Sequence, residues 1–449
     1  MQNTFNKLTW AVAVAAAAAA AAAAFAGQAS AGGYQINEQS VSGQGYGHAG
    51  RSSNVNDATI VFGNPAGMSF LDRAQLTAGG TYLNVNSRIR NAEATRDFGA
   101  GPVPVEGSSD GDMVPGTLIP FAFYAHPVNE QLAFGFGVYA PFGSKTDYED
   151  GFVGRNLGNY TELRVMSAQP TVSYRFNDQW AIGAGITYNR VDGELRRQVA
   201  NPFSPNNTDA DIDARIEGDD DAWGYNLGVI FQPIPETTLG LTYRSKVSYT
   251  LTGDYRATDP SGLVDLIAPE RLNRDAKLDL TTPEMINFSI TQQMSDRLKL
   301  MAGASWVRWS RFDEIRVVDP NDADGPPITF EQQDYSNAWA YGVGGEYQLN
   351  PQLALRAGVT LDFTPTSDQF RSARIPSDDR RIFSVGAGWT PMENLTLDFA
   401  YSYLTERGTQ VDQSRLDHEF LPVPDVTSTY TADYKNEAHG FGAQLTYRF

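Results

Sequence analysis

The feature that most constrains this chain is an alternation of apolar and polar residues, which begins after Leu76 and continues for most of the 449 residues. In residues 239–251 the odd positions are mostly aliphatic or aromatic, and the even positions are small, polar or charged. Successive side chains of a β-strand point to opposite faces, so each such stretch predicts a strand with one apolar and one polar face. The polar faces carry charged residues, among them Arg244, Lys246, Arg356, Asp362 and Asp398. A polar interior and an apolar exterior are typical of a β-barrel that faces lipid.

The composition excludes several other classes of protein. The absence of cysteine excludes a disulfide scaffold, a cysteine zinc site and a thiol enzyme. The chain has 34 basic against 53 acidic residues and no basic cluster, so we expect no nucleic-acid partner. A mean hydropathy of −0.36 argues against a bundle of membrane helices, because each helix needs a run of about 20 apolar residues.

The first 31 residues have the pattern of a secretory signal peptide. Lys7 is their one charged residue, and an alanine-rich apolar run follows it. Ala29 and Ala31 are small residues at the two positions that a signal peptidase reads, which predicts cleavage before Gly32. A retained membrane anchor is the alternative. Export of a lipid-facing barrel predicts the outer membrane of a Gram-negative cell as its location.

Short and long connections alternate along the chain and determine the number of strands. Six tight turns are expected at residues 129–130, 177–178, 233–236, 295–296, 350–351 and 392–394. Seven longer polar loops are expected near residues 91–113, 144–160, 198–221, 256–277, 319–333, 370–380 and 411–430. Thirteen connections join fourteen strands, and an even number places both termini on the periplasmic side. The sequence therefore predicts an all-β fold, a 14-stranded antiparallel transmembrane β-barrel over residues 74–449.

Residues 32–73 precede the first strand and do not alternate. They are rich in glycine, serine, asparagine and glutamine, which makes them too polar to form a core of their own. A barrel of about 14 strands has a lumen that is either filled or conducts water. We therefore expect this segment to fold back into the lumen as a hatch.

The start of this segment, Gly33-Tyr34-Gln35-Ile36-Asn37-Glu38-Gln39-Ser40, and its later Asn64-Pro65-Ala66-Gly67-Met68 resemble the FadL family of outer-membrane transporters. Further similarities follow in order through the chain, at Leu241-Thr242-Tyr243-Arg244-Ser245, Pro283-Glu284-Met285, Ser305-Trp306 and Ile375-Pro376. The family transports long-chain fatty acids and other hydrophobic compounds. The resemblance implies a fourteen-stranded barrel closed by a hatch that includes Tyr34, Asn37, Glu38, Asn64, Pro65 and Ala66.

The resemblance also implies a lateral exit at a kink in the third strand. That strand runs from Leu132 to Tyr139 and continues into Pro141-Phe142-Gly143. Proline has no N–H to offer a neighbouring strand and glycine adds little pairing strength, so these residues themselves predict a break in pairing. A plain edge bulge is the alternative interpretation.

A fatty acid has an aliphatic tail and one carboxylate, which arginine binds well because its planar guanidinium donates two hydrogen bonds and stays charged. The resemblance gives this role to Arg197, past the end of the fifth strand, and to Arg316 in the ninth. Arg196 is the alternative to Arg197. Salt bridges inside the lumen are the structural alternative for both aligned arginines, with Glu346, Asp362 or Asp398 as partners.

Two loops differ in the surface that they offer outside the membrane. After the seventh strand, Leu263, Leu266 and Ile267 fall on one helical face, which predicts a capture surface for hydrophobic ligands. Packing of that helix on its neighbours is the alternative. The loop after the fifth strand is acidic, with Asp209, Asp211, Asp213 and residues 219–221. We expect it to be solvated, because a Ca²⁺ loop needs a closing glycine and a bidentate glutamate in register.

No motif points to catalysis, to a cofactor or to a metal site. The run Gly45-Tyr46-Gly47-His48-Ala49-Gly50 fits G-x-G-x-x-G, but no apolar strand precedes it and no βαβ unit follows. The four histidines are scattered. We therefore expect a monomeric protein that is not an enzyme and needs no cofactor.

The resemblance implies a passive outer-membrane transporter of long-chain fatty acids. It also implies that the ligand is captured at the outer loops, binds in the lumen and leaves sideways at the third-strand kink after the hatch rearranges. Its partners are the hydrophobic ligand and outer-membrane lipid. An importer of aromatic hydrocarbons of the same family and a general diffusion porin are the alternatives.

Overall fold

The computed structural model describes residues 33–109, 112–201, 203–322, 324–417 and 425–449. The predicted signal peptide of residues 1–31 and its cleavage before Gly32 lie outside this range. None of the helices within it is long and apolar enough to span a membrane.

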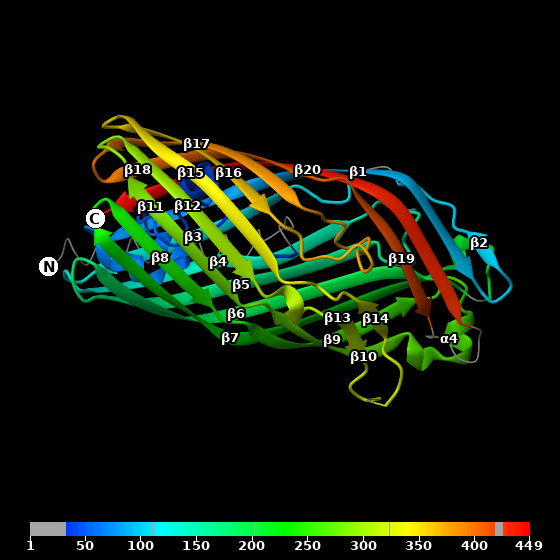
Figure 1. The fold of residues 1–449 in the computed structure, drawn as a ribbon. Coiled ribbons are helices and arrows are strands. Elements are labelled where there is room, and N and C mark those ends of the chain that lie inside the picture. Colours follow the sequence, from blue (N-terminus) through cyan, green and yellow to red (C-terminus); the bar gives the residue numbers. More distant parts are fainter. Residues whose placement is uncertain (1–32, 110–111, 202, 323, 418–424) are drawn as a thin grey trace.

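The strands form one antiparallel sheet that closes on itself, because β1 pairs with β20 from Gln75 opposite Arg448 to Asp97 opposite Thr427 (Figure 1). The strands of the described residues are β1 (Gln75–Asp97), β2 (Pro102–Pro104), β3 (Thr117–Pro127), β4 (Leu132–Asp147), β5 (Tyr160–Arg175), β6 (Trp180–Val199), β7 (Ile212–Ile234), β8 (Thr237–Arg244), β9 (Val247–Thr258), β10 (Asn273–Thr282), β11 (Met285–Gln293), β12 (Leu298–Val307), β13 (Glu314–Val318), β14 (Thr329–Gln332), β15 (Ala338–Asn350), β16 (Leu353–Asp362), β17 (Arg380–Met392), β18 (Leu395–Glu406), β19 (Thr409–Asp417) and β20 (Val426–Arg448).

The closed wall has fourteen strands, as the sequence predicts. Five of them are interrupted once, so that β8 continues as β9, β10 as β11, β12 as β13, β14 as β15 and β18 as β19. Pro283 lies at one of these interruptions, where its missing N–H cannot join the ladder. The short strand β2 pairs only with the outer end of β1 and adds no span.

The wall is apolar outside and polar inside. Phe288 is 48% exposed and its neighbour Ser289 is 2% exposed, and the same contrast holds for Phe399 at 54% and Asp398 at 1%. Because neighbouring strand residues point to opposite faces, the exposed face meets lipid and the buried face lines the bore. The C-terminus and the short turns β15–β16 and β17–β18 lie at one end, and α4 (Leu263–Ile267) lies at the other (Figure 1).

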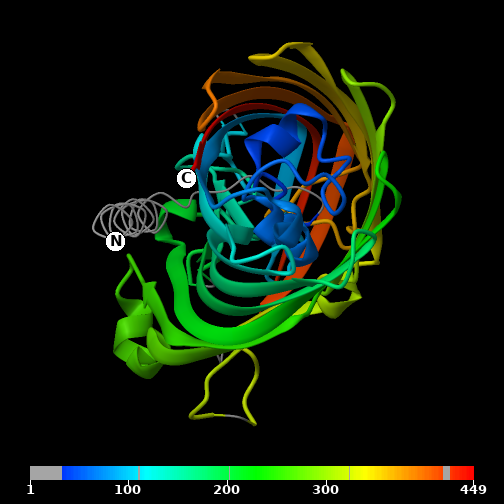
Figure 2. The same ribbon diagram turned by 90° about the vertical axis from the view of Figure 1, so that its left-hand side faces the viewer.

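Residues 33–73 occupy the interior of the barrel, where we call them the hatch segment (Figure 2). The segment contains α2 (Val41–Gly45), α3 (Ile60–Gly63) and the 3₁₀ helix η1 (Pro65–Phe70). Its side chains and carbonyls bond to different sides of the wall. Gln44 donates to the Ser402 hydroxyl of β18, Ser52 donates to the Gly240 carbonyl of β8, and Ser173 of β5 donates to the Ala66 carbonyl. One segment can form hydrogen bonds to strands on several sides of the wall only if it lies in the bore.

Local sequence explains two of the helix starts in this segment. Ser40 precedes α2 and its hydroxyl accepts the N–H of Gly43, and Asn64 precedes η1 and accepts the N–H of Ala66. Pro65 stands at the first position of η1, where no N–H is needed. Gly240 lets the segment approach the wall, because a Cβ there would overlap the Ser52 carbonyl oxygen.

The remaining short helices lie in connections. They are η2 (Thr208–Ala210), α4, η3 (Pro269–Arg271) and η4 (Trp309–Arg311).

Candidate functional site

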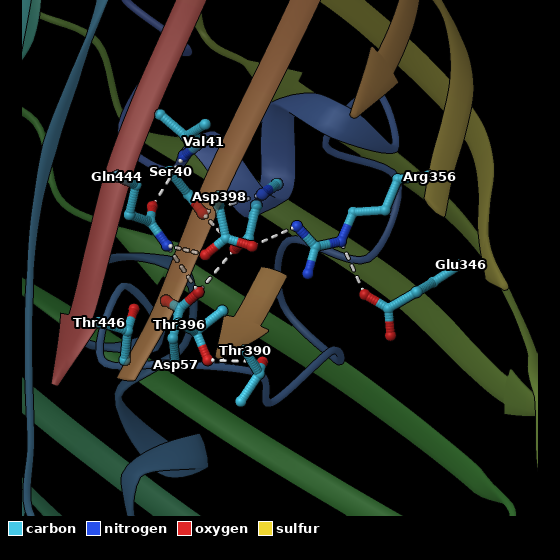
Figure 3. Close-up of polar contacts among 12 residues, drawn as sticks. Ser40, Val41, Asp57, Glu346, Arg356, Thr390, Thr396, Asp398, Gln444 and Thr446 are labelled. Carbon is cyan, nitrogen blue, oxygen red and sulfur yellow. Dashed lines mark hydrogen bonds and ion pairs between the residues drawn. The ribbon is translucent and has the colours of Figure 1, made fainter. Parts of the chain in front are cut away.

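A chain of buried charges fixes one side of the hatch segment to the wall (Figure 3). Arg356 of β16 donates to Glu346 of β15 at 2.7 Å and to Asp398 of β18 at 2.5 Å. Lys299 of β12 extends the chain to the other carboxylate oxygen of Glu346 at 3.1 Å. A buried charge is tolerated when it is paired and hydrogen-bonded, and this chain meets both conditions.

Gln444 of β20 joins this chain to the hatch segment. Its amide nitrogen donates to Asp398 at 3.1 Å and to Asp57 at 3.0 Å, and its carbonyl oxygen accepts the N–H of Val41 at 2.9 Å. Asp57 also accepts from the Ser42 hydroxyl at 2.6 Å. We call residues 40–73 the hatch body, because side-chain bonds of this kind anchor it.

The wall has a gap between β3 and β4. These strands pair from Ala122 opposite Val138 to Pro127 opposite Ala133, and the ladder between them does not continue past Val138. Beyond that point β4 stays with β5, but its register shifts between Tyr139 and Phe142. The predicted residues Pro141, Phe142 and Gly143 stand at this place, and their role as a lateral exit stays a prediction.

The start of the hatch segment takes the position beside β4 that β3 leaves. The N–H of Ile36 donates to the Pro141 carbonyl at 2.9 Å, and the N–H of Gly143 donates to the Tyr34 carbonyl at 2.7 Å. The Gln39 side chain donates to the Ala140 carbonyl at 2.5 Å. We call residues 33–39 the arm. Its backbone forms an isolated antiparallel bridge to β4, with Gln35 opposite Phe142.

Ile36 of the arm closes the inner side of the gap. It packs with Leu83 of β1, Ile119 of β3 and Ala140 of β4, and all four are buried. We call these residues the Ile36 cluster. The cluster contains one residue from each of the two strands that border the gap, one from the adjacent β1 and one from the arm, so movement of the arm would uncover the gap.

An apolar cavity lies beside Tyr34 on the other side of the arm. It encloses about 690 Å³, part of it open to solvent, and we call it the Tyr34 cavity. Its lining is largely aliphatic and includes Leu195, Leu251, Leu280, Phe312, Ile315 and Val317. The apolar character of the exposed surface is typical of a site for a hydrophobic small molecule.

Aromatic rings separate the Tyr34 cavity from the gap. The ring of Tyr34 lies 4.6 Å from that of Trp309, 5.2 Å from that of Phe312 and 5.9 Å from that of Phe142, in edge-to-face geometry. Gly33 has a φ of +71°, and a Cβ there would lie 2.6 Å from the Trp309 ring. Only glycine allows the arm to pass this close to Trp309.

The two aligned arginines do not meet at this cavity. Arg197 is buried in β6 on the same face as the cavity residue Leu195, two residues and thus about 7 Å further along the strand. Arg316 lies between the cavity residues Ile315 and Val317, so it points to the opposite face of β13, with its guanidinium 5.8 Å from the centre of the Phe330 ring. The orientation of Arg316 argues against a shared carboxylate, and the roles of Arg197 and Arg316 stay predictions.

Two of the three carboxylates suggested as salt-bridge partners of these arginines, Glu346 and Asp398, pair with another arginine. Glu346 and Asp398 both bind Arg356. Arg196, the alternative to Arg197, is exposed and pairs with Glu194 at 2.5 Å over the Tyr160 ring. Arg197 is thus the inward-facing member of the pair.

The other predicted hatch residues contact the rest of the segment or the wall. Asn37 accepts from Arg51 at 2.9 Å, and the Asn64 amide donates to the Ser52 carbonyl at 2.7 Å and to the Val229 carbonyl of β7 at 3.0 Å.

Burial raises the pKa of Glu38 above its ordinary value, although the nearby Arg51 charge opposes the shift. Pro65 and Ala66 lie against Gly183 of β6, where a Cβ would strike their backbone.

The predicted capture surface is partly exposed. Leu266 is 79% and Ile267 is 51% exposed at the end of α4, whereas Leu263 is half-buried and Val264 is buried. Asp259 holds the helix start by accepting the N–H of Val264 at 2.7 Å. Burial acts to raise the pKa of Asp259, but hydrogen bonds from Ser261, Val264 and Leu263 lower it below its ordinary value.

The acidic residues expected in one loop are distributed over several places. Asp209 is in η2, and Asp213 and residues 219–221 belong to β7. Asp211 is buried and pairs with Arg96 at 2.7 Å. Within the described ranges, no group of three or more histidines or acidic residues could hold a metal ion.

Sequence reasoning missed a segment that enters the bore. Residues 363–379 join β16 to β17 and include most of the polar loop predicted near residues 370–380, yet Arg371, Ala373, Arg374 and Ile375 are all buried. The signal was the apolar Ile375-Pro376 within an otherwise polar stretch. Connecting loops usually run over the protein surface, so an apolar pair in a polar connection indicates that this part is buried.

Comparisons with known proteins agree with this architecture. A family model described as "Outer membrane protein transport protein (OMPP1/FadL/TodX)" matches residues 22–449. Outer membrane protein P1 of Haemophilus influenzae is 28% identical over 94% of this chain and 96% of P1. The long-chain fatty acid transport protein of Escherichia coli K12 is 24% identical over 94% of this chain and 95% of its own. A crystal structure of a Pseudomonas aeruginosa FadL homologue has the same fold, with a TM-score of 0.81 at 24% identity over 93% of this chain and 99% of that one.

Proposed function

Because the chain belongs to the OMPP1/FadL/TodX family of outer-membrane transport proteins, it is a transporter of hydrophobic compounds, and we propose that its substrates are long-chain fatty acids. The observation that carries the proposal is the apolar Tyr34 cavity with the buried Arg197 beyond its end. Burial of a sixteen-carbon tail stabilises the complex by at most about 12 kcal/mol, at ~0.8 kcal/mol per CH₂. The tail therefore supplies the affinity and the arginine orients the head group.

The proposed route begins at Leu266 and Ile267 and leads through the Tyr34 cavity to the gap between β3 and β4. The arm lies between the cavity and the gap, with Tyr34 packed beside the cavity residue Phe312 and Ile36 in the cluster at the gap. Displacement of the arm from β4 opens the route sideways into the membrane. Transfer is downhill and needs no cofactor.

Aromatic hydrocarbons are the second candidate class of substrate. The Tyr34 cavity favours them, because the surface that it exposes is largely apolar and three of the four charged residues in its described lining, Glu162, Glu194 and Glu217, are acidic, with Lys277 the fourth. A hydrocarbon has no carboxylate and would not use Arg197. A general diffusion porin is disfavoured because the hatch body crosses the bore, and the family gives no support for an enzyme.

Alanine substitutions at Arg197 and Arg316 test the choice of substrate. The Arg197→Ala variant is expected to weaken oleate binding by about tenfold to a hundredfold, because a hydrogen bond to a charged group contributes roughly 1.5–3 kcal/mol. Binding of toluene should not change. The matched control Arg316→Ala removes an arginine on the outer face of β13 and should leave both ligands unaffected.

Equilibrium binding of both ligands to purified protein in detergent measures these effects. Equal losses of oleate and toluene in the Arg197→Ala variant would refute a carboxylate site at this position. Oleate affinity that depends on Arg316 and not on Arg197 would refute the placement of the head group.

A further inference from the structure

The buried part of the β16–β17 connection bonds to several strands of the wall. We call residues 373–377 the strap. At one end of the strap, Thr146 of β4 and Tyr148 just beyond β4 donate to the carbonyls of Arg374 and Ala373 at 2.7 Å each. At the other end Asn436 of β20 donates to the Pro376 carbonyl at 2.7 Å. The strap is thus attached to β20 and to the end of β4, which β1 and β3 separate in the closed sheet.

Arg374 fixes the strap from a third side. Its guanidinium donates to Glu331 of β14 at 2.9 Å, to the Tyr160 carbonyl at 2.9 Å and to the Leu157 carbonyl at 3.3 Å. Pulling this buried arginine away from its acceptors would cost several kcal/mol of folding free energy. The strap is therefore a permanent part of the interior.

The strap divides the interior into two cavities. The Tyr34 cavity lies on one side, and a second cavity of about 770 Å³, part of it open to solvent, lies on the other, between the strap and β1, β17, β18 and β20. Its apolar lining includes Leu83, Val85, Met113, Ile382 and Leu404, and Glu38 of the arm also lines it. We call it the Glu38 cavity. Ile375 lines both cavities and therefore forms the partition between them.

The charges around the Glu38 cavity are balanced without a ligand. Its two cations are Arg374, which pairs with Glu331, and Arg380, which pairs with Glu406 at 2.6 Å. Glu38, Glu406 and Glu437 all border the cavity. A free carboxylate in this cavity would find each cation already paired and three acidic side chains nearby, so the site disfavours an anion.

One hydrogen-bond donor in this lining has no partner. The Nη1 group of Arg380 is buried and donates to no acceptor among the described residues. The pairing of Arg380 with Glu406 uses Nε, so Nη1 remains available. A buried donor without an acceptor costs free energy, and an oxygen of a bound molecule would remove that cost.

We propose that the Glu38 cavity is a second ligand site, which binds a hydrophobic molecule whose polar group is an uncharged oxygen acceptor, such as a long-chain alcohol or ester. The tail packs on the aliphatic lining and the oxygen accepts from Nη1 of Arg380. This inference rests on the proposed function, because the ligand reaches the cavity through the same bore. Leu83 and Val85 of the lining also contact the Ile36 cluster, which places the second site next to the gap.

A matched pair of cavity-filling variants tests the second site. Ala438→Trp fills the Glu38 cavity from β20, and Ala276→Trp fills the Tyr34 cavity from β10. The probes are 1-hexadecanol and hexadecanoate, titrated separately into the full mature protein in detergent. The number of bound molecules is counted by native mass spectrometry, and the affinity of each site is measured by calorimetry.

The wild-type protein should bind two molecules of hexadecanol and one of hexadecanoate. Ala438→Trp should weaken one hexadecanol site by at least about tenfold, equivalent to 1.4 kcal/mol, and leave hexadecanoate binding unchanged. The inference is overturned if the Ala438→Trp variant still binds two hexadecanol molecules, or if it loses hexadecanoate as strongly as hexadecanol. Ala438→Phe, a smaller change with the same expected direction, replaces it if the tryptophan variant fails to fold.

The Ala276→Trp variant separates this inference from the proposed function. It should lose hexadecanoate and one hexadecanol molecule. If hexadecanoate binding survives in Ala276→Trp while Ala438→Trp still removes one hexadecanol, the proposed fatty-acid site fails and the second site stands.

Discussion

The hatch body and the arm are adjacent in sequence but are held in opposite ways. The body is bound through side chains to the charge chain of Arg356 and Asp398 and to polar residues of the surrounding strands. The arm is bound to β4 mainly through backbone groups and apolar packing of Ile36 and Tyr34. Backbone bonds can be replaced by those of another strand, whereas a buried charge has no alternative partner. The contrast predicts that the arm moves and the body stays.

The largest expected effect comes from removing the centre of the charge chain. Arg356→Ala leaves the carboxylates of Glu346 and Asp398 without their shared cation, and breaking a buried pair in this way costs about 3–5 kcal/mol. We expect a lower thermal midpoint of unfolding in detergent and a higher ion conductance in planar bilayers.

Arg164→Ala is the control for this variant. Arg164 pairs with Asp192 at 3.3 Å, but both side chains are about one-third exposed, so its loss should cost about 1 kcal/mol or less. If the two variants unfold at the same midpoint, the charge chain does not anchor the body.

A smaller and local effect is expected from the arm. Ile36→Ala removes the buried side chain that fills the gap, and an isoleucine-to-alanine change in a core costs about 2 kcal/mol or more. This energy should appear as easier detachment of the arm, with roughly thirtyfold faster hydrogen exchange at the Gly143 amide and little change in global unfolding.

The exposed Ile186 provides the matched control. The Ile186→Ala variant should leave exchange at Gly143 unchanged, because this side chain is 56% exposed on the barrel exterior. A fall in global stability without faster exchange at Gly143 would show that arm and body open as one unit.

The smallest expected effect concerns the close approach of the body to the wall. Gly240→Ala places a Cβ against the Ser52 carbonyl, and such overpacking typically costs about 1–3 kcal/mol. We expect a modest drop in the unfolding midpoint. Gly408→Ala, whose nearest neighbour would be the Tyr434 carbonyl oxygen at 3.8 Å, should have a much weaker effect. Identical midpoints would mean that the body shifts freely in the bore.

The barrel could be predicted from local sequence, but the ligand site could be predicted only in part. The alternation that assigns Phe288 outward and Ser289 inward is visible in any single strand. The same alternation places the Arg316 side chain on the opposite face of its strand from Ile315 and Val317. The resemblance to a family, in contrast, gives Arg316 a role in ligand binding. The strap was missed because its burial depends on Tyr148, Asn436 and Glu331, which are far away in sequence.

The sequence by itself determined the number of strands and the face that each one turns to lipid, because both follow from a two-residue period and from turn positions. Tertiary structure decided that the arm, and not β3, lies beside the bent end of β4. It also decided that a connection between β16 and β17 divides the bore into two cavities. The physical reason is that closing a barrel brings distant strands around one small volume, and the residues that share this volume are not neighbours in the chain.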